Sequence, residues 1–177
     1  MDALAPFRIP MSALKADSES FDWLVGPEFF AVFDDEHQPP RGNFKVLMEL
    51  ERTGLVVTLD FDIKGSLLTT CDRCMVPIDM KVENQFQLIV KSGDPEESTD
   101  EVIFIDPESP ELNVGKSIYD FILLSIPISH RIPDCETLEI PPCDMSIVNY
   151  LKENKVEEVT PEDPNLLWDQ LRKAIDN

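Results

Sequence analysis

Apolar and polar residues alternate most regularly in the middle of the chain. Residues 44–51, 55–63 and 78–90 each place apolar side chains at nearly every second position, with mostly polar or charged ones between them. In the third run the apolar set is Ile78, Met80, Val82, Phe86, Leu88 and Val90. A period of two with one polar face is typical of strands in an antiparallel sheet that has one face in water.

Shorter apolar runs at residues 21–25, 66–70 and 102–105 predict further strands. Arg52-Thr53-Gly54 predicts a hairpin turn between the first two long strands, and Gly65 is expected to end the second. The pattern as a whole predicts a curved antiparallel sheet of about five or six strands. Partial closure of this sheet into a barrel is one outcome of such curvature.

Two helices are expected. Asn113 is a suitable N-cap for a helix that Pro127 ends, and this helix carries Val114, Ile118, Phe121, Ile122 and Ser125 on one face. A short amphipathic helix with Trp168, Leu171, Ala174 and Ile175 follows a solvated linker at residues 152–165. The fold class is therefore α+β, with one domain over residues 1–150 and an acidic linker and tail helix over residues 151–177.

The charge is strongly negative. The 177 residues include 35 acidic and 15 basic ones, for a formal net charge of −20. A surface of this sign repels nucleic acid phosphates and anionic membranes, and it attracts basic proteins. No apolar run approaches the roughly 18 residues that span a bilayer, and the N-terminus shows no secretory signal. A cytoplasmic protein is expected.

The four cysteines are the main candidate chemistry. Cys71 and Cys74 form a Cys-Asp-Arg-Cys pair in a turn between strands, and Cys135 and Cys143 follow in a Pro-rich segment with seven residues between them. Two such pairs can supply four thiolates to a tetrahedral structural zinc. Reduced thiols that pack as small apolar residues, and a redox pair or disulfide, are the other interpretations.

His130 lies in the same segment, where it could replace Cys143 as a ligand or make an ordinary hydrogen bond. Arg73, Arg131 and Lys116 are too few to predict a nucleic-acid-binding stripe. Ser125, Ser129 and His130 come without a Gly-x-Ser-x-Gly elbow, and the chain has no P-loop and no Gly-x-Gly-x-x-Gly. No catalytic residues are predicted, and the chain is not expected to be an enzyme.

Four segments, in order along the chain, resemble one known family. They are Ile9-Pro10-Met11-Ser12-Ala13-Leu14-Lys15, Cys71-Asp72-Arg73-Cys74, Asp120-Phe121-Ile122-Leu123-Leu124-Ser125-Ile126-Pro127, and the ending from Asp163-Pro164 through Trp168 to Lys173. This pattern is similar to that of the YceD-like large ribosomal RNA subunit accumulation proteins. The resemblance implies a factor needed for normal levels of large-subunit ribosomal RNA, with no known catalytic activity.

Charge and resemblance together predict how such a factor would act. A protein of net charge −20 is unlikely to coat RNA, so we expect it to bind a basic ribosomal protein or assembly factor and to meet ribosomal RNA only indirectly or locally. The alternative is a zinc-ribbon regulator that binds nucleic acid, and a basic groove beside the cysteines would favour it.

Overall fold

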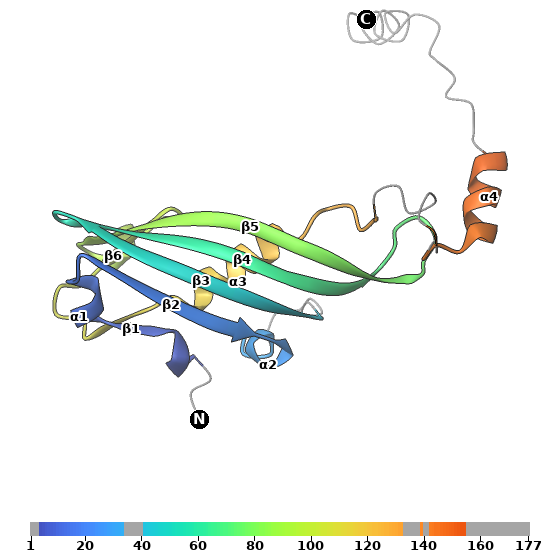
Figure 1. Ribbon diagram of the computed structural model, residues 1–177. Helices are drawn as coiled ribbons and strands as arrows, with labels where there is room; N and C mark the ends of the chain where they lie inside the picture. The colour runs from blue at the N-terminus through green and yellow to red at the C-terminus, as the bar shows by residue number, and fades with distance from the viewer. Residues whose placement is uncertain (1–3, 34–40, 133–138, 140–141, 155–177) are drawn as a thin grey trace, which may run out of the picture.

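The computed structural model describes residues 4–33, 41–132, 139 and 142–154. Its main element is a long, twisted five-stranded sheet with the strand order β2-β3-β4-β5-β6 (Figure 1). The strands are β2 (Ser18–Val25), β3 (Gly42–Thr53), β4 (Val56–Thr70), β5 (Pro77–Ser92) and β6 (Val102–Ile105). The predicted α+β class is thereby confirmed.

Strands β2 to β5 are antiparallel, and β6 joins β5 in parallel. The register between β4 and β5 is continuous from Val57 opposite Val90 to Thr70 opposite Pro77. One face therefore collects all the buried apolar positions of the long strands, as the alternation predicts, while the other carries the polar positions.

The shorter elements lie along one edge and the ends of this sheet. They are η1 (Ala5–Phe7), α1 (Met11–Leu14), α2 (Pro27–Phe30), η2 (Pro95–Glu97) and a two-stranded antiparallel sheet of β1 (Arg8–Pro10) and β7 (Glu111–Asn113). The β1–β7 pair ties the start of the chain to the segment that precedes the main helix.

Helix α3 (Gly115–Ser125) covers the apolar face of the sheet. Its buried side includes Ile118, Phe121, Ile122 and Ser125, as predicted. The Phe121 ring stacks on Phe86 at 4.5 Å between centroids and meets Phe61 edge-on at 5.2 Å. The N-cap is Val114 and makes no side-chain capping bond, so the prediction of Asn113 as the cap is wrong by one residue; the Asn113 side chain accepts a hydrogen bond from the Gly115 N–H just before the helix.

Three expectations about the sheet are wrong. The sheet is not antiparallel throughout, because β6 runs parallel to β5. The sheet does not close into a barrel, because β2 and β6 lie at opposite ends of the strand order and do not pair. Gly65 does not end a strand, since β4 runs through it to Thr70. A Cβ atom at Gly65 would lie 2.4 Å from the Asn43 carbonyl oxygen, so glycine is required there for the close approach of β3.

Helix α4 (Met145–Glu153) was not predicted. It begins at Asp144, whose side chain accepts a hydrogen bond from the Ser146 N–H, and it lies at the end of the molecule farthest from α1 (Figure 1). The expected tail helix lies outside the described residues, and the division at residue 150 stays a prediction. Within the described part of the chain, no helix has the length and apolar content to span a membrane.

Candidate functional site

The Cys71–Cys74 turn closes a two-stranded extension of the sheet, where β4 and β5 continue past the other strands (Figure 1). Two backbone hydrogen bonds fix the turn, from the Cys71 N–H to the Val76 carbonyl and from the Met75 N–H to the Cys71 carbonyl, both at 2.9 Å. Met75 takes the left-handed conformation with φ 61°. The turn therefore presents both cysteines from one hydrogen-bonded segment.

Both thiols of this turn are free and buried, with exposed fractions of 3% for Cys71 and 1% for Cys74. The backbone N–H of Val76 lowers the pKa of the Cys74 thiol, and the N–H of Asp144 and the Cys71 thiol act in the same direction against the effect of burial. Hydrogen bonds donated to sulfur favour the thiolate, which is the form that binds metal.

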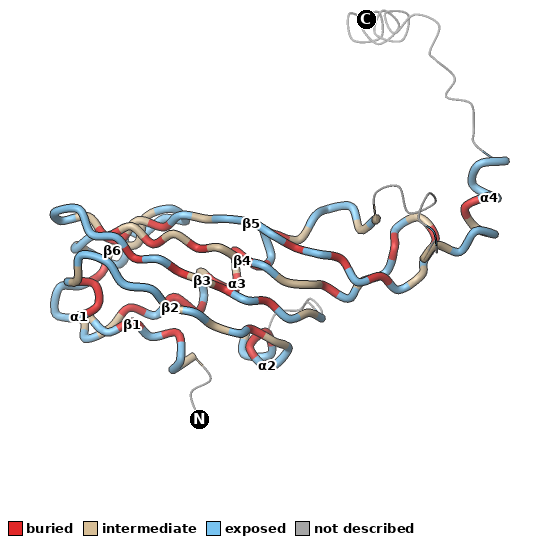
Figure 2. The backbone as a smooth tube through the Cα atoms, viewed as in Figure 1, coloured by how far each residue is buried: buried red, intermediate tan, exposed pale blue. Residues whose placement is uncertain are grey.

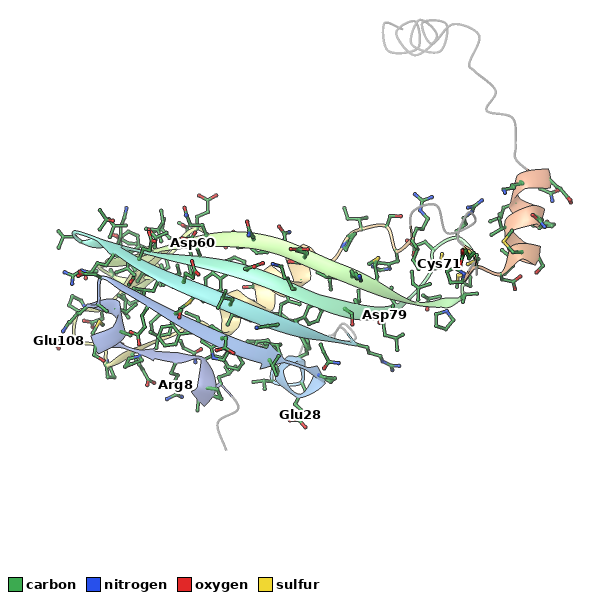
Figure 3. The ribbon with its side chains drawn as sticks, in the orientation of Figure 1. Arg8, Glu28, Asp60, Cys71, Asp79 and Glu108 are labelled. Atoms are coloured by element: carbon green, nitrogen blue, oxygen red, sulfur yellow. The ribbon has the colours of Figure 1, made fainter. Side chains whose placement is uncertain are left out.

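Around these thiols lies a small apolar cluster that is separate from the main core. We call it the cysteine cluster; its buried members are Cys71, Cys74, Ile78 and Val148, packed with Val76, Ile132, Cys143 and Ile147. Val148 is the buried residue of α4, and Figure 2 shows buried positions along the β4–β5 extension toward this turn. Figure 3 shows the Cys71 label where the turn meets the base of α4. The cluster thus anchors α4 to the sheet.

Of the second cysteine pair, Cys143 lies within the described residues. Cys143 lies in the cysteine cluster and takes part in a disulfide bond, and Cys135 lies outside the described residues. Among the described residues, no three Cys, His, Asp or Glu side chains come close enough to hold a metal ion. The four-cysteine zinc site therefore stays a prediction, and it requires Cys143 in its reduced form.

His130 is joined to the turn through Asp72 rather than through a cysteine. The Asp72 N–H donates to the His130 carbonyl at 3.0 Å, and the His130 N–H donates to the Asp72 carboxylate at 2.6 Å. The His130 ring lies 3.4 Å from the Thr69 hydroxyl and 3.7 Å from an Asp72 carboxylate oxygen. This reciprocal pairing fixes the segment after α3 against the turn, a role for Asp72 that the sequence pattern did not reveal.

A groove of about 670 Å³ runs beside the turn, lined from β4, from the end of α3 and by His130. Its charged lining consists of Arg41 and Asp72. Arg131 donates to Ser129, and Lys116 pairs with Asp120 one helical turn away on α3. Among the described residues, the lining of this groove is therefore not basic, which does not favour nucleic acid binding there.

The polar face of the sheet is acidic. Glu49 of β3 lies directly opposite Asp60 of β4, and Leu47 lies opposite Asp62. Like charges opposite each other on neighbouring strands are destabilising. One carboxylate oxygen of Asp62 is buried without a hydrogen-bond partner among the described residues, while the other accepts from Lys64. The face carries the further acids Asp22, Glu51, Asp79 and Glu83 and the lysines Lys45, Lys64 and Lys81, so that acidic side chains outnumber basic ones on it.

Comparison with known protein families identifies a matching family model. The family described as Large ribosomal RNA subunit accumulation protein YceD matches residues 59–173. The matched region contains most of β4, the cysteine turn, β5, α3 and α4. No curated protein and no solved structure matches the chain.

Proposed function

Because the chain belongs to the YceD family of large ribosomal RNA subunit accumulation proteins, we propose that it supports accumulation of large-subunit ribosomal RNA as a non-enzymatic factor in the cytoplasm. The family match confirms the resemblance, and it includes the Cys-Asp-Arg-Cys turn, the α3 segment and the Trp168 segment. The segment at residues 9–15 lies outside the matched region.

We propose that the chain acts by binding a basic ribosomal protein or assembly factor. The observation that carries this step is the acidic sheet face, where Glu49 opposes Asp60 and a carboxylate oxygen of Asp62 is buried without a partner. A basic side chain placed over this face would relieve the repulsion between Glu49 and Asp60. Ribosomal RNA would add further negative charge to a molecule that already carries a net charge of −20.

Depletion of the protein, followed by sedimentation of ribosomal subunits and quantification of both large RNAs, tests the role in the cell. The expected result is a selective fall in the large subunit and its RNA, restored by the wild-type chain. Normal subunit levels after depletion would contradict the role.

The choice between protein and RNA is tested with the purified full chain at physiological salt. We expect it to bind one or more purified basic proteins of the large subunit and to leave naked large-subunit RNA unbound. Glu49→Lys should weaken protein binding about tenfold, since it reverses a charge on the acidic face, whereas Glu28→Lys on the short helix α2 should not. Tight binding to naked RNA would contradict the proposal.

We further propose that the cysteines hold a structural zinc. The two free, buried thiols and the N–H groups directed at Cys74 support this proposal, and Cys143 in the same cluster would be a ligand after reduction. Cys135 is the fourth predicted ligand. The ion would add no catalysis; it would fix α4 and the turn.

Metal analysis of the reduced chain tests the zinc proposal. About one zinc per chain should co-purify, and Cys71→Ser should lose it, while Met75→Ser in the same turn should keep it. A reduced wild-type chain without metal after expression in zinc-supplemented cells would contradict the proposal.

A further inference from the structure

Strand β5 is only partly covered by a neighbour on its outer edge. Strand β6 pairs with Ile89–Ser92 alone, and the part of β5 from Pro77 to Leu88 pairs with β4 on its other side. Within the part of the chain that the structure describes, no other strand pairs with this stretch, which therefore forms a long free edge (Figure 1). A free edge presents unpaired N–H and C=O groups that can accept another strand.

The direction of the backbone groups shows which residues form this edge. The Ile89 N–H donates to the Glu101 carbonyl beside β6, so the backbone N–H and C=O groups of Ile89 point toward the outer edge of β5. Backbone groups alternate sides along a strand, and Asp79, Lys81, Glu83, Gln85 and Gln87 therefore point the same way. Among the described residues, one of these edge-facing backbone groups makes a hydrogen bond: the Gln85 N–H donates to the Asn84 side chain.

A groove of about 820 Å³ lies beside this edge, at the point where β6 begins. Its apolar floor comes from β5, β6 and α3 and consists of Phe86, Leu88, Ile103, Phe121, Leu123 and Leu124. Leu124 is 69% exposed, and Phe86 is only partly buried although its ring stacks on Phe121. An added strand would direct every second side chain into this groove.

The negative charge around the groove favours a positively charged binding partner. Asp100, Glu101 and Asp120 line it, and its lysine, Lys116, is already paired with Asp120. The other face of an added strand would lie beside Asp79, Lys81 and Glu83 of the polar sheet face, where Glu83 already pairs with Lys64 at 3.2 Å. A second copy of this chain is disfavoured as the occupant, because two molecules of net charge −20 repel each other.

We propose that the free edge of β5 binds an extended segment of a partner protein, in which apolar residues alternate with lysine or arginine, as an additional strand of the sheet. The apolar residues enter the groove against Phe86 and Leu124, and the basic residues lie over the acidic face. This is strand addition, in which backbone hydrogen bonds supply affinity and alternate side chains supply specificity. It rests on the proposed function in one respect, the basic character of the partner.

The first test is amide hydrogen exchange of the full chain with a ten-residue probe peptide of alternating lysine and valine. Exchange at the Lys81, Glu83 and Gln87 amides should slow at least tenfold on saturation. The Val82 amide, which points toward β4, should change little. A peptide of alternating lysine and proline has the same charge but cannot extend a sheet, so it should produce no such pattern.

The second test blocks the edge in the protein. Glu83→Pro removes an edge N–H without removing a hydrogen bond to β4, and it should weaken binding of the lysine-valine peptide at least tenfold. Glu83→Gln keeps the N–H and should weaken it less than threefold. Leu124→Arg should weaken it severalfold by placing a cation in the groove, whereas Leu55→Arg, at a hairpin tip where Leu55 is 91% exposed, should not.

The outcomes separate this inference from the proposed function. Binding of the lysine-valine peptide without protection of the edge amides, or equal binding by Glu83→Pro and wild type, would overturn the edge inference and leave a basic partner on the acidic face intact. Failure of the peptide to bind at all would also overturn the inference. Subunit levels after depletion test the cellular role independently of either result.

Discussion

The main core and the cysteine cluster are held together by different means. The main core joins the sheet, α3 and the N-terminal segments through a continuous set of buried apolar residues, with Ile9, Phe30 and Ile118 fully buried. Among the described residues, the cysteine cluster has four buried members, two of which are cysteines. A cluster of that size removes too little apolar surface from water to hold α4 by burial alone. We therefore expect hydrogen bonds and cross-links at sulfur to contribute to its stability.

The comparison predicts two kinds of response to mutation. A change in the main core should lower the stability of the whole protein, because the sheet and α3 share one core. A change in the cysteine cluster should release α4 and the turn and leave the sheet folded, since local openings cost less than global unfolding.

The largest expected effect is that of Phe61→Ala. The Phe61 side chain is 1% exposed and packs edge-on against Phe121, and a cavity of this kind costs about 3 to 5 kcal/mol. Urea unfolding should show this loss in the single transition of the sheet. Leu55→Ala, which truncates an exposed side chain, should change the free energy of unfolding by less than about 0.5 kcal/mol. A local effect of Phe61→Ala, confined to α3, would contradict a shared core.

Val148→Ala should have a smaller and local effect. Val148 is fully buried and is the buried contact of α4 with the cysteine cluster, and loss of its two methyl groups should cost about 2 kcal/mol. Faster amide exchange is expected in α4, with the unfolding midpoint of the sheet nearly unchanged. Leu151→Ala, at a position 42% exposed, is the matched control. An equal shift of the sheet midpoint would show that the two regions are one cooperative unit.

Asp144→Ala should have the smallest effect. The Asp144 carboxylate caps α4 by accepting from the Ser146 N–H at 2.9 Å, and loss of an N-cap costs about 1 kcal/mol. Amide exchange at the start of α4 should quicken, whereas Asp144→Asn, which keeps an accepting oxygen, should stay close to wild type. Identical exchange in both variants would rule out the cap.

The long strands were predictable because each has one buried face, so hydrophobic periodicity alone located β3, β4 and β5. Gly65 misled the prediction, because a strand-ending glycine and one that permits close approach of a neighbouring strand look the same in sequence. Barrel closure depends on whether β2 and β6 meet, which no local pattern encodes.

The candidate site was only partly predictable. The Cys71–Cys74 spacing located the turn, but the pairing of Asp72 with His130 joins residues 58 positions apart. Asp144 is a typical N-cap residue and could have indicated the start of helix α4, but the Pro-rich sequence before it favoured an irregular segment. The free edge of β5 could not be read from sequence, since a paired and an unpaired strand share the same alternation.

The most direct test of the two-region account is residue-level amide exchange of the reduced, zinc-loaded full chain before and after addition of a chelator. The account predicts that amides of residues 71–76 and of α4 lose protection at least tenfold, while those of β3, β4 and α3 around Phe61 and Ile118 keep theirs. Loss of protection across the whole sheet, or no change anywhere, would contradict it.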